Sequence, residues 1–365
     1  MEKDLLLIGS VPLETAPEVL ETCGQALGKH LPCIPDGETG DRIIWTTLMA
    51  YRVFHGHPDL ETLRRPLPEN GVEYFKPRNR EDSWRFRVRK GVDHVRFGDP
   101  GWRLGYAKDA INSYFVFRAL RDKGALPPKI RFQVSLPPPT SAVDIWFDDP
   151  ADLERVKPGF EAALGAEIAK IVEKIPPEDL AIQWDACVET LDVEGLYRES
   201  HKHKMGASLQ ERIDRNMGQF RRLSTAIPET VMLGYHFCYG TLGGWPIMAP
   251  KDLSATVAFA NEAVSHTGRR IDFIHVPILP TTDEKYFAPL RELKPKGAAV
   301  YFGAIHNMES DSEFKKRLAL IQKYYKGDFG LAGYCGFGRH KADEVPKLMQ
   351  EHLKASQLLS EMAKT

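Results

Sequence analysis

The stretch Val231-Met232-Leu233-Gly234-Tyr235-His236-Phe237-Cys238 is a short, mostly apolar run that ends in two reactive side chains. Its length and composition are typical of a strand that is buried on both faces. Because side chains two residues apart on a strand point to the same side, His236 and Cys238 could reach one ligand. We therefore expect a buried strand over Val231–His236, with reactive side chains at its carboxyl end.

Six further runs share this character, and amphipathic stretches separate most of them. The other predicted strands are Leu5–Gly9, Ile130–Leu136, Leu180–Asp185, Ile271–Val276, Ala298–Gly303 and Gly330–Cys335. The predicted helices are Glu14–Leu27, Asp152–Ile175, Ser208–Thr225, Leu253–His266, Ser312–Tyr325 and Ala342–Met362. Alternating strands and helices predict βαβ units and a parallel sheet. We expect an eighth strand between residues 45 and 125, which gives an α/β fold, a (β/α)₈ barrel, as a single domain over residues 1–365.

Two segments are expected near the mouth of this barrel. Trp84–Arg89 and Val92–Phe97 alternate around Lys90-Gly91, a pattern that predicts an inserted antiparallel β-hairpin. The polar, glycine-rich segment 35–42 is interpreted as a lid that offers Glu38 and Arg42 to a substrate. A plain surface turn is the alternative for that segment, because its composition also suits one.

Composition and charge restrict the functional classes. The chain of 365 residues has 49 basic and 50 acidic side chains, so its charge favours neither nucleic acid nor an anionic membrane as a partner. No run approaches the roughly 20 apolar residues that a membrane span needs, and the apolar run at the N-terminus is too short for a signal peptide. Five cysteines do not predict a disulfide framework. We expect a cytoplasmic protein, with a homodimer left open.

Reactive residue types collect at the predicted strand ends, where a barrel places its catalytic groups. They are Ser10, Asp185, His236, Cys238, His275, His306 and Cys335. Zinc binds histidine nitrogen and cysteine thiolate, and a catalytic zinc keeps one position open. A His-x-Cys pair alone is more typical of a buried cysteine beside a histidine. The third candidate ligand, Cys335 at a later strand end, favours a metal site.

Five short segments resemble, in the same order, the catalytic barrel of cobalamin-independent methionine synthase and its superfamily, which includes uroporphyrinogen decarboxylase-like proteins. They are Ile8–Pro12, Ile182–Asp185, His236–Cys238, Ile305-His306 and Cys335-Gly336. The resemblance implies that His236, Cys238 and Cys335 bind zinc, which holds a substrate thiol as thiolate for attack on an alkyl carbon. It also implies that His306 is the general acid and that Ser10 and Asp185 hold the substrate.

The sequence departs from that family in two ways. A glutamate on the sixth strand of the family also binds zinc, but the matching stretch here, Ile274–Pro277, contains His275 instead. His275 is predicted either as the replacement ligand or as a substrate contact. The N-terminal half of full-length methionine synthases has no counterpart, which leaves the alkyl donor and the acceptor thiol open.

Other interpretations compete with a zinc-dependent methyltransferase or alkyltransferase. A lyase or decarboxylase could use the same barrel without zinc, and a zinc-binding barrel could lack turnover. Cys187 is interpreted as a buried thiol, not as a catalytic one. The pairs His55-Gly56-His57 and His201-Lys202-His203 are interpreted as solvated loops, although their spacing resembles that of metal ligands.

Overall fold

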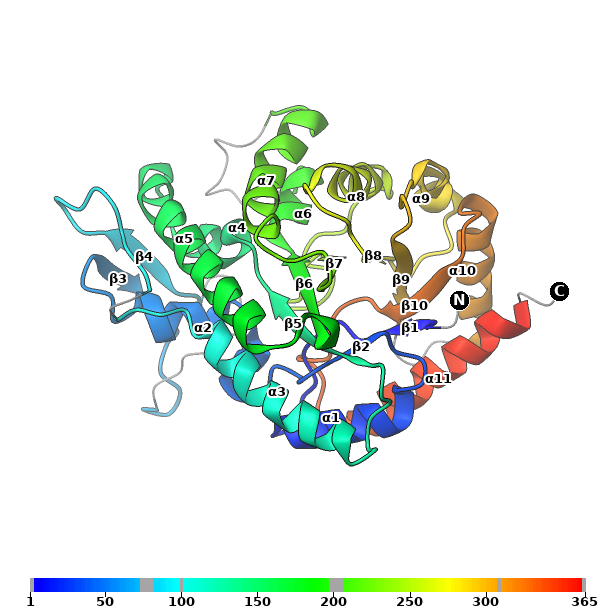
Figure 1. Cartoon of the computed structure of the whole chain (residues 1–365). Coiled ribbons are helices and arrows are strands. Elements are labelled where there is room, and N and C mark those ends of the chain that lie inside the picture. The colour runs from blue at the N-terminus through cyan, green and yellow to red at the C-terminus, as the bar shows by residue number, and fades with distance from the viewer. Residues whose placement is uncertain (1–2, 73–81, 99–100, 197–205, 307–309, 363–365) are drawn as a thin grey trace.

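Eight parallel strands form the main sheet of the structure, a computed structural model that describes residues 3–72, 82–98, 101–196, 206–306 and 310–362. Helices surround this sheet, and a separate two-stranded sheet projects to one side (Figure 1). The strands of the main sheet are β1 (Leu5–Leu6), β2 (Cys33–Pro35), β5 (Arg131–Leu136), β6 (Leu180–Ala186), β7 (Met232–Phe237), β8 (Phe273–Pro277), β9 (Ala299–Ile305) and β10 (Phe329–Gly333).

The α-helices follow the strands along the chain. They are α1 (Ala16–Leu27), α2 (Thr47–Met49), α3 (Tyr106–Asp122), α4 (Pro139–Val143), α5 (Pro150–Lys174), α6 (Val188–Val193), α7 (Leu209–Ser224), α8 (Ser254–His266), α9 (Glu284–Phe287), α10 (Asp311–Tyr324) and α11 (Val345–Met362). Side-chain caps set several starts: Thr15 caps α1, Ser208 caps α7 and Ser310 caps α10. All six helices predicted from the sequence are present.

The strand order is β1-β10-β9-β8-β7-β6-β5-β2, so the sheet curls until its two edge strands meet. Two backbone hydrogen bonds join the edge segments: the Leu5 N–H donates to the His30 carbonyl at 3.2 Å, and the Val11 N–H donates to the Gly37 carbonyl at 2.9 Å. The result is a nearly closed barrel, which confirms the predicted (β/α)₈ fold.

The prediction for the eighth strand was wrong in position. The strand is β2, three residues long, and it pairs in parallel with β5, Cys33 opposite Arg131. A run of three residues that ends in a proline is too short to show a periodic pattern. Residues 45–125 contribute α2, α3 and the separate sheet instead.

The inserted sheet is present, but one predicted partner strand was wrong. Strand β4 (Arg85–Val88) pairs antiparallel with β3 (Leu60–Arg64), not with Val92–Phe97. The later segment lies against α5 instead, where the Val95 N–H donates to the Arg155 carbonyl at 3.0 Å. Gly159 permits this contact, because a Cβ there would lie 2.0 Å from the Val95 oxygen. Tertiary packing thus outcompetes the local hairpin pattern.

Buried apolar side chains form two layers. A small cluster on and beside the barrel strands comprises Leu6, Ile8, Cys33, Ala181, Phe273, Tyr301 and Ala332. A much larger cluster lies between the strands and the surrounding helices. Both faces of most strands are therefore buried, as their continuous apolar runs predict. No helix in the described part of the chain combines the length and apolarity needed to cross a membrane.

Candidate metal centre

Three potential metal ligands meet at the carboxyl ends of two strands. His236 is the fifth residue of β7, Cys238 follows that strand directly, and Cys335 follows β10. Alternation along the chain sends His236 and Cys238 to the inside, while Phe237 packs outward at a ring-centroid distance of 5.2 Å from Phe259 of α8. Strand β7 and the residue that follows it thus supply two of the three candidate ligands.

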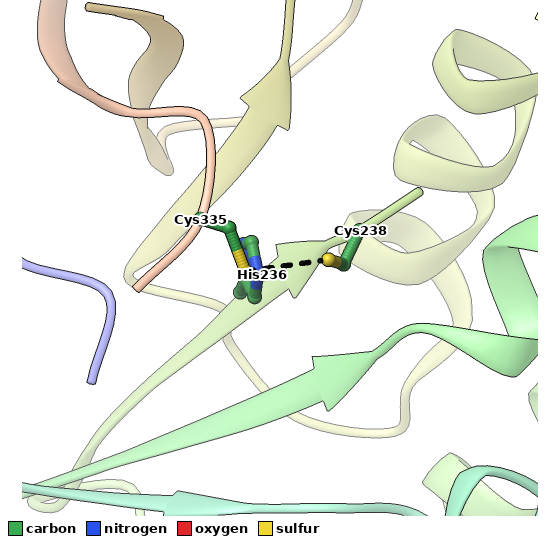
Figure 2. A group of neighbouring side chains, drawn as sticks. All are labelled: His236, Cys238 and Cys335. Carbon is green, nitrogen blue, oxygen red and sulfur yellow. Dashed lines mark hydrogen bonds between the residues drawn. The ribbon is translucent and has the colours of Figure 1, made fainter. Parts of the chain in front are cut away.

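The spacing of these donors suits a tetrahedral ion. The Cys335 Sγ lies 3.6 Å from the Cys238 Sγ and 3.7 Å from the His236 Nε2, and the three side chains converge (Figure 2). Zinc–ligand bonds of about 2.3 Å to sulfur and about 2.0 Å to nitrogen, at tetrahedral angles, separate two sulfurs by about 3.8 Å and a sulfur from a nitrogen by about 3.5 Å. The side chains therefore need little rearrangement to hold zinc.

The pKa values of all three donors are shifted toward their neutral forms. Hydrogen bonding to Cys187, together with burial, raises the pKa of Cys238, and hydrogen bonding to Cys238, together with burial, raises that of Cys335. Burial lowers the pKa of His236 well below its usual value, so its imidazole is neutral and can act as a ligand. A divalent ion would offset the cost of placing two thiolates together in a buried site.

His275 does not lie with this group. Its Nδ1 is 2.8 Å from the Nδ1 of His236, and its Nε2 is 3.0 Å from the carbonyl oxygen of Gly333. Both ring nitrogens are thus engaged, and burial lowers the pKa of His275 to about 4. The structure therefore places His275 against His236 and apart from the group of three candidate ligands.

A polar group lies beside the three donors. The Ser10 hydroxyl donates to Glu38 Oε2 at 2.6 Å, and Gln183 Nε2 donates to Asp185 Oδ1 at 2.7 Å. Gly9 lets Glu38 approach closely, because a Cβ there would lie 3.2 Å from its Oε1. The structure therefore brings Ser10, Glu38 and Asp185 to the same cavity as the candidate ligands.

Burial raises the pKa of both carboxyl groups. The charge of Glu38 raises the pKa of Asp185 further, and the charge of Asp36 raises that of Glu38. The pKa of Glu38 rises to about 7, and that of Asp185 rises well above its usual range. A positive charge placed between them would favour the ionised forms, so the pair is suited to bind a cationic group or to hold a proton.

Arg42 lies behind this pair and does not line the main cavity. Its guanidinium donates to both oxygens of Asp36, at 3.2 and 2.7 Å, and Asp36 in turn accepts the Glu38 N–H at 3.0 Å. Glu38 has a left-handed backbone with φ 49°, a strained conformation that this network holds. In this structure Arg42 supports Glu38 through Asp36.

The structure does not bring His306 to the cavity. The ring stacks on Tyr334 at a centroid distance of 5.4 Å, and its Nε2 donates to the Ile278 carbonyl at 2.7 Å. Burial, with Arg317 nearby, lowers the pKa of His306 to about 3. In this arrangement His306 is not placed as the general acid that the sequence led us to expect.

The cavity that joins these groups has a volume of about 150 Å³ and mostly apolar walls. The walls include Ile43, Trp45, Trp146, Leu191 and Ile247, and Ser83, two residues before β4, also lines the cavity. Cys187 also lines it and is only 7% exposed, in agreement with the interpretation as a buried thiol. The paired histidines at 201–203 lie outside the described residues.

One cavity residue was missed from the sequence. Arg339 lies on the wall, four residues after Cys335. Within the described ranges no carboxylate pairs with it, and desolvation lowers its pKa. Its loop is held in place by the Phe337 N–H, which donates to the Ser10 carbonyl at 2.7 Å. Its place just beyond a predicted strand end was the signal that could have found it.

Comparisons with known proteins found distant similarity to solved structures. The sequence matches no known family profile and no curated protein. A methyltransferase from Methanosarcina mazei is similar over 97% of this chain and 94% of its own, at 12% identity and a TM-score of 0.48. A protein from Burkholderia cenocepacia, provisionally named a phosphonomutase, is similar over 70% of this chain and 80% of its own, at 14% identity and a TM-score of 0.32.

Proposed function

We propose that the protein is a zinc-dependent alkyltransferase, of methyl groups among others, that alkylates a small thiol. The observation that carries the proposal is the group of His236, Cys238 and Cys335, whose donor atoms lie within 4.8 Å of one another at the wall of the cavity. Three protein ligands leave one position of a tetrahedral ion open to a substrate. Zinc bound there would supply a Lewis acid that keeps a thiol deprotonated near neutral pH.

Side chains beside the candidate ligands could bind the acceptor and accept its proton. Asp185 and Glu38 offer two carboxyl groups beside the candidate ligands, one held by Gln183 and one by Ser10. They can hold an ammonium group of the acceptor or take the proton that the thiol releases. The net reaction joins sulfur to the alkyl carbon, breaks the bond from that carbon to its leaving group, and transfers the thiol proton to the surroundings or to that group.

The side chains that line the cavity indicate which substrates it would bind. Apolar side chains such as Trp45, Trp146 and Ile247 suit the hydrocarbon parts and exclude water. Arg339 adds a cation without a carboxylate partner among the described residues, which suits a negatively charged group on the acceptor. We therefore propose a small thiol with charged groups as acceptor and an apolar alkyl donor.

Metal analysis followed by a thiol assay tests this function. Purified protein should contain about one zinc per chain, as three ligands around one ion predict. With 3-mercaptopropionate and iodomethane as probes, the zinc-loaded protein should form the methyl thioether faster than chelator-treated protein, as followed by mass spectrometry. Protein that binds zinc but no thiol would be a zinc-binding barrel without turnover, and protein without zinc would favour the lyase or decarboxylase alternative.

A further inference from the structure

His275 occupies a fully buried position between the metal centre and the backbone of β10. It is 0% exposed, with one ring nitrogen 3.0 Å from the Gly333 carbonyl and the other 2.8 Å from His236. Gly303 on β9 leaves room for this ring, because a Cβ there would lie 2.5 Å from His275 Nε2. Three strands, β8, β9 and β10, thus shape the site of one imidazole.

The Gly333 carbonyl oxygen determines which atom donates in each of these two hydrogen bonds. A carbonyl oxygen only accepts, so His275 Nε2 must carry a hydrogen. In a neutral imidazole the other nitrogen, Nδ1, is then an acceptor, and His236 Nδ1 must be the donor. That leaves the lone pair of His236 on Nε2, the nitrogen that lies 3.7 Å from the Cys335 sulfur.

We propose that His275 is a positioning residue that holds His236 in its Nδ1–H tautomer, with Nε2 free to bind a metal ion, and leaves the ion three protein ligands. The inference rests on the metal site of the proposed function but not on alkyl transfer. In the family that the sequence resembles, the stretch matching Ile274–Pro277 supplies a glutamate ligand to zinc. In this chain we propose that the stretch supplies a residue that orients a ligand.

The geometry argues against His275 as a fourth ligand. To reach the sulfurs, the ring would have to give up its bonds to Gly333 and His236 in a fully buried environment. Leaving a buried polar group without a hydrogen-bond partner is destabilising. A fourth ligand to a bound ion would therefore come from the cavity, which Asp185 and Glu38 line.

Two substitutions and one spectroscopic measurement test the inference. His275→Asn keeps an oxygen near the former Nδ1 that can accept from His236, whereas His275→Leu fills the space without an acceptor. Zinc affinity, measured by competition with a chromophoric chelator, should fall roughly 10–100-fold in His275→Leu. His275→Asn should recover most of that loss, which a merely space-filling role would not produce.

The tautomer is measured directly in the metal-free wild-type protein. Two-bond proton–nitrogen NMR spectra of ring-labelled histidine should show His236 protonated at Nδ1, with the signal assigned through its loss in His236→Gln. An Nε2–H tautomer, or a zinc affinity that His275→Leu leaves unchanged, would overturn the inference. Because the spectra need neither zinc nor folded variants at position 275, they test the inference even if the proposed function fails.

Discussion

The thiol sulfurs of Cys238 and Cys335 lie 3.6 Å apart, although 97 residues separate them in the sequence. Cys238 directly follows the carboxyl end of β7, Cys335 lies two residues beyond the end of β10, and two strands lie between β7 and β10 in the sheet. The closure of the barrel directs both side chains to the same interior point. Neither the segment of Cys238 nor that of Cys335 could form the site alone.

Replacing either cysteine should remove the metal. In Cys238→Ser and Cys335→Ser a neutral hydroxyl replaces a thiolate. Zinc affinity should therefore fall by more than the roughly 10–100-fold typical of substitutions at residues that only hydrogen-bond to a metal ligand. The measurement is zinc content after dialysis, together with chelator competition. Cys187→Ala is the matched control, because Cys187 lines the cavity but is not one of the three donors. Equal zinc loss in the control would contradict the three-ligand assignment.

Gly303→Ala should weaken zinc binding without contact to any ligand. The added methyl group would lie 2.5 Å from His275 Nε2 and 3.0 Å from the Tyr334 Cα, so the imidazole must move and release His236. We expect a lower zinc affinity and a destabilisation of roughly 1–3 kcal/mol from overpacking, measured by denaturant unfolding. Gly165→Ala is the control, because its Cβ would make an ordinary contact at 3.7 Å with Leu223. Unchanged zinc affinity in Gly303→Ala would contradict the expectation.

Arg339→Gln should discriminate between thiols by charge. Hydrogen bonds to charged groups contribute roughly 1.5–3 kcal/mol, so affinity for 3-mercaptopropionate should fall roughly 10- to 150-fold. Binding of neutral 2-mercaptoethanol to the same zinc-loaded protein should change little. Calorimetric titration measures both, and Arg118→Gln on the exposed face of α3 serves as the control. An equal loss for the two thiols would point to a structural role for Arg339.

Glu38→Gln should alter how stability depends on pH. The folded state raises the pKa of Glu38 from 4.5 to about 7, so between these values the folded chain binds more protons than the unfolded chain. The free energy of unfolding that this group contributes must therefore fall as pH rises through that window. Metal-free Glu38→Gln should show a flatter decline from pH 5 to 8 than the wild type, by urea unfolding at each pH. Asp36, Arg42 and Asp185 face the same group, and their charges act in both proteins. Parallel pH curves for the two proteins would contradict the prediction.

The long, regular elements could be predicted because their patterns are local. Seven strands were found from short apolar runs, and six helices from the amphipathic stretches between them. The same local reasoning failed for β2, which is too short to show a pattern, and for Val92–Phe97, whose alternation is overridden by contact with α5. Patterns of alternation describe which face is buried, but not which segment covers it.

The candidate ligands were predictable because strand ends in a barrel share one face, and reactive residues stood at those ends. The roles of the neighbouring residues could not be predicted from the sequence. The identities of His275, His306 and Arg42 do not indicate which groups lie opposite their side chains. His275 turned out to face a carbonyl, His306 an aromatic stack and Arg42 an aspartate.

The sequence by itself thus determined the alternation of strands and helices, and with it the positions at which Cys238 and Cys335 leave their strands. Only the tertiary structure decided that the two sulfurs meet beside His236 and that His275 stands behind it. The physical reason is range: periodicity and capping act over a few residues, whereas hydrogen-bond partners and electrostatic neighbours depend on distances through space that barrel closure alone establishes.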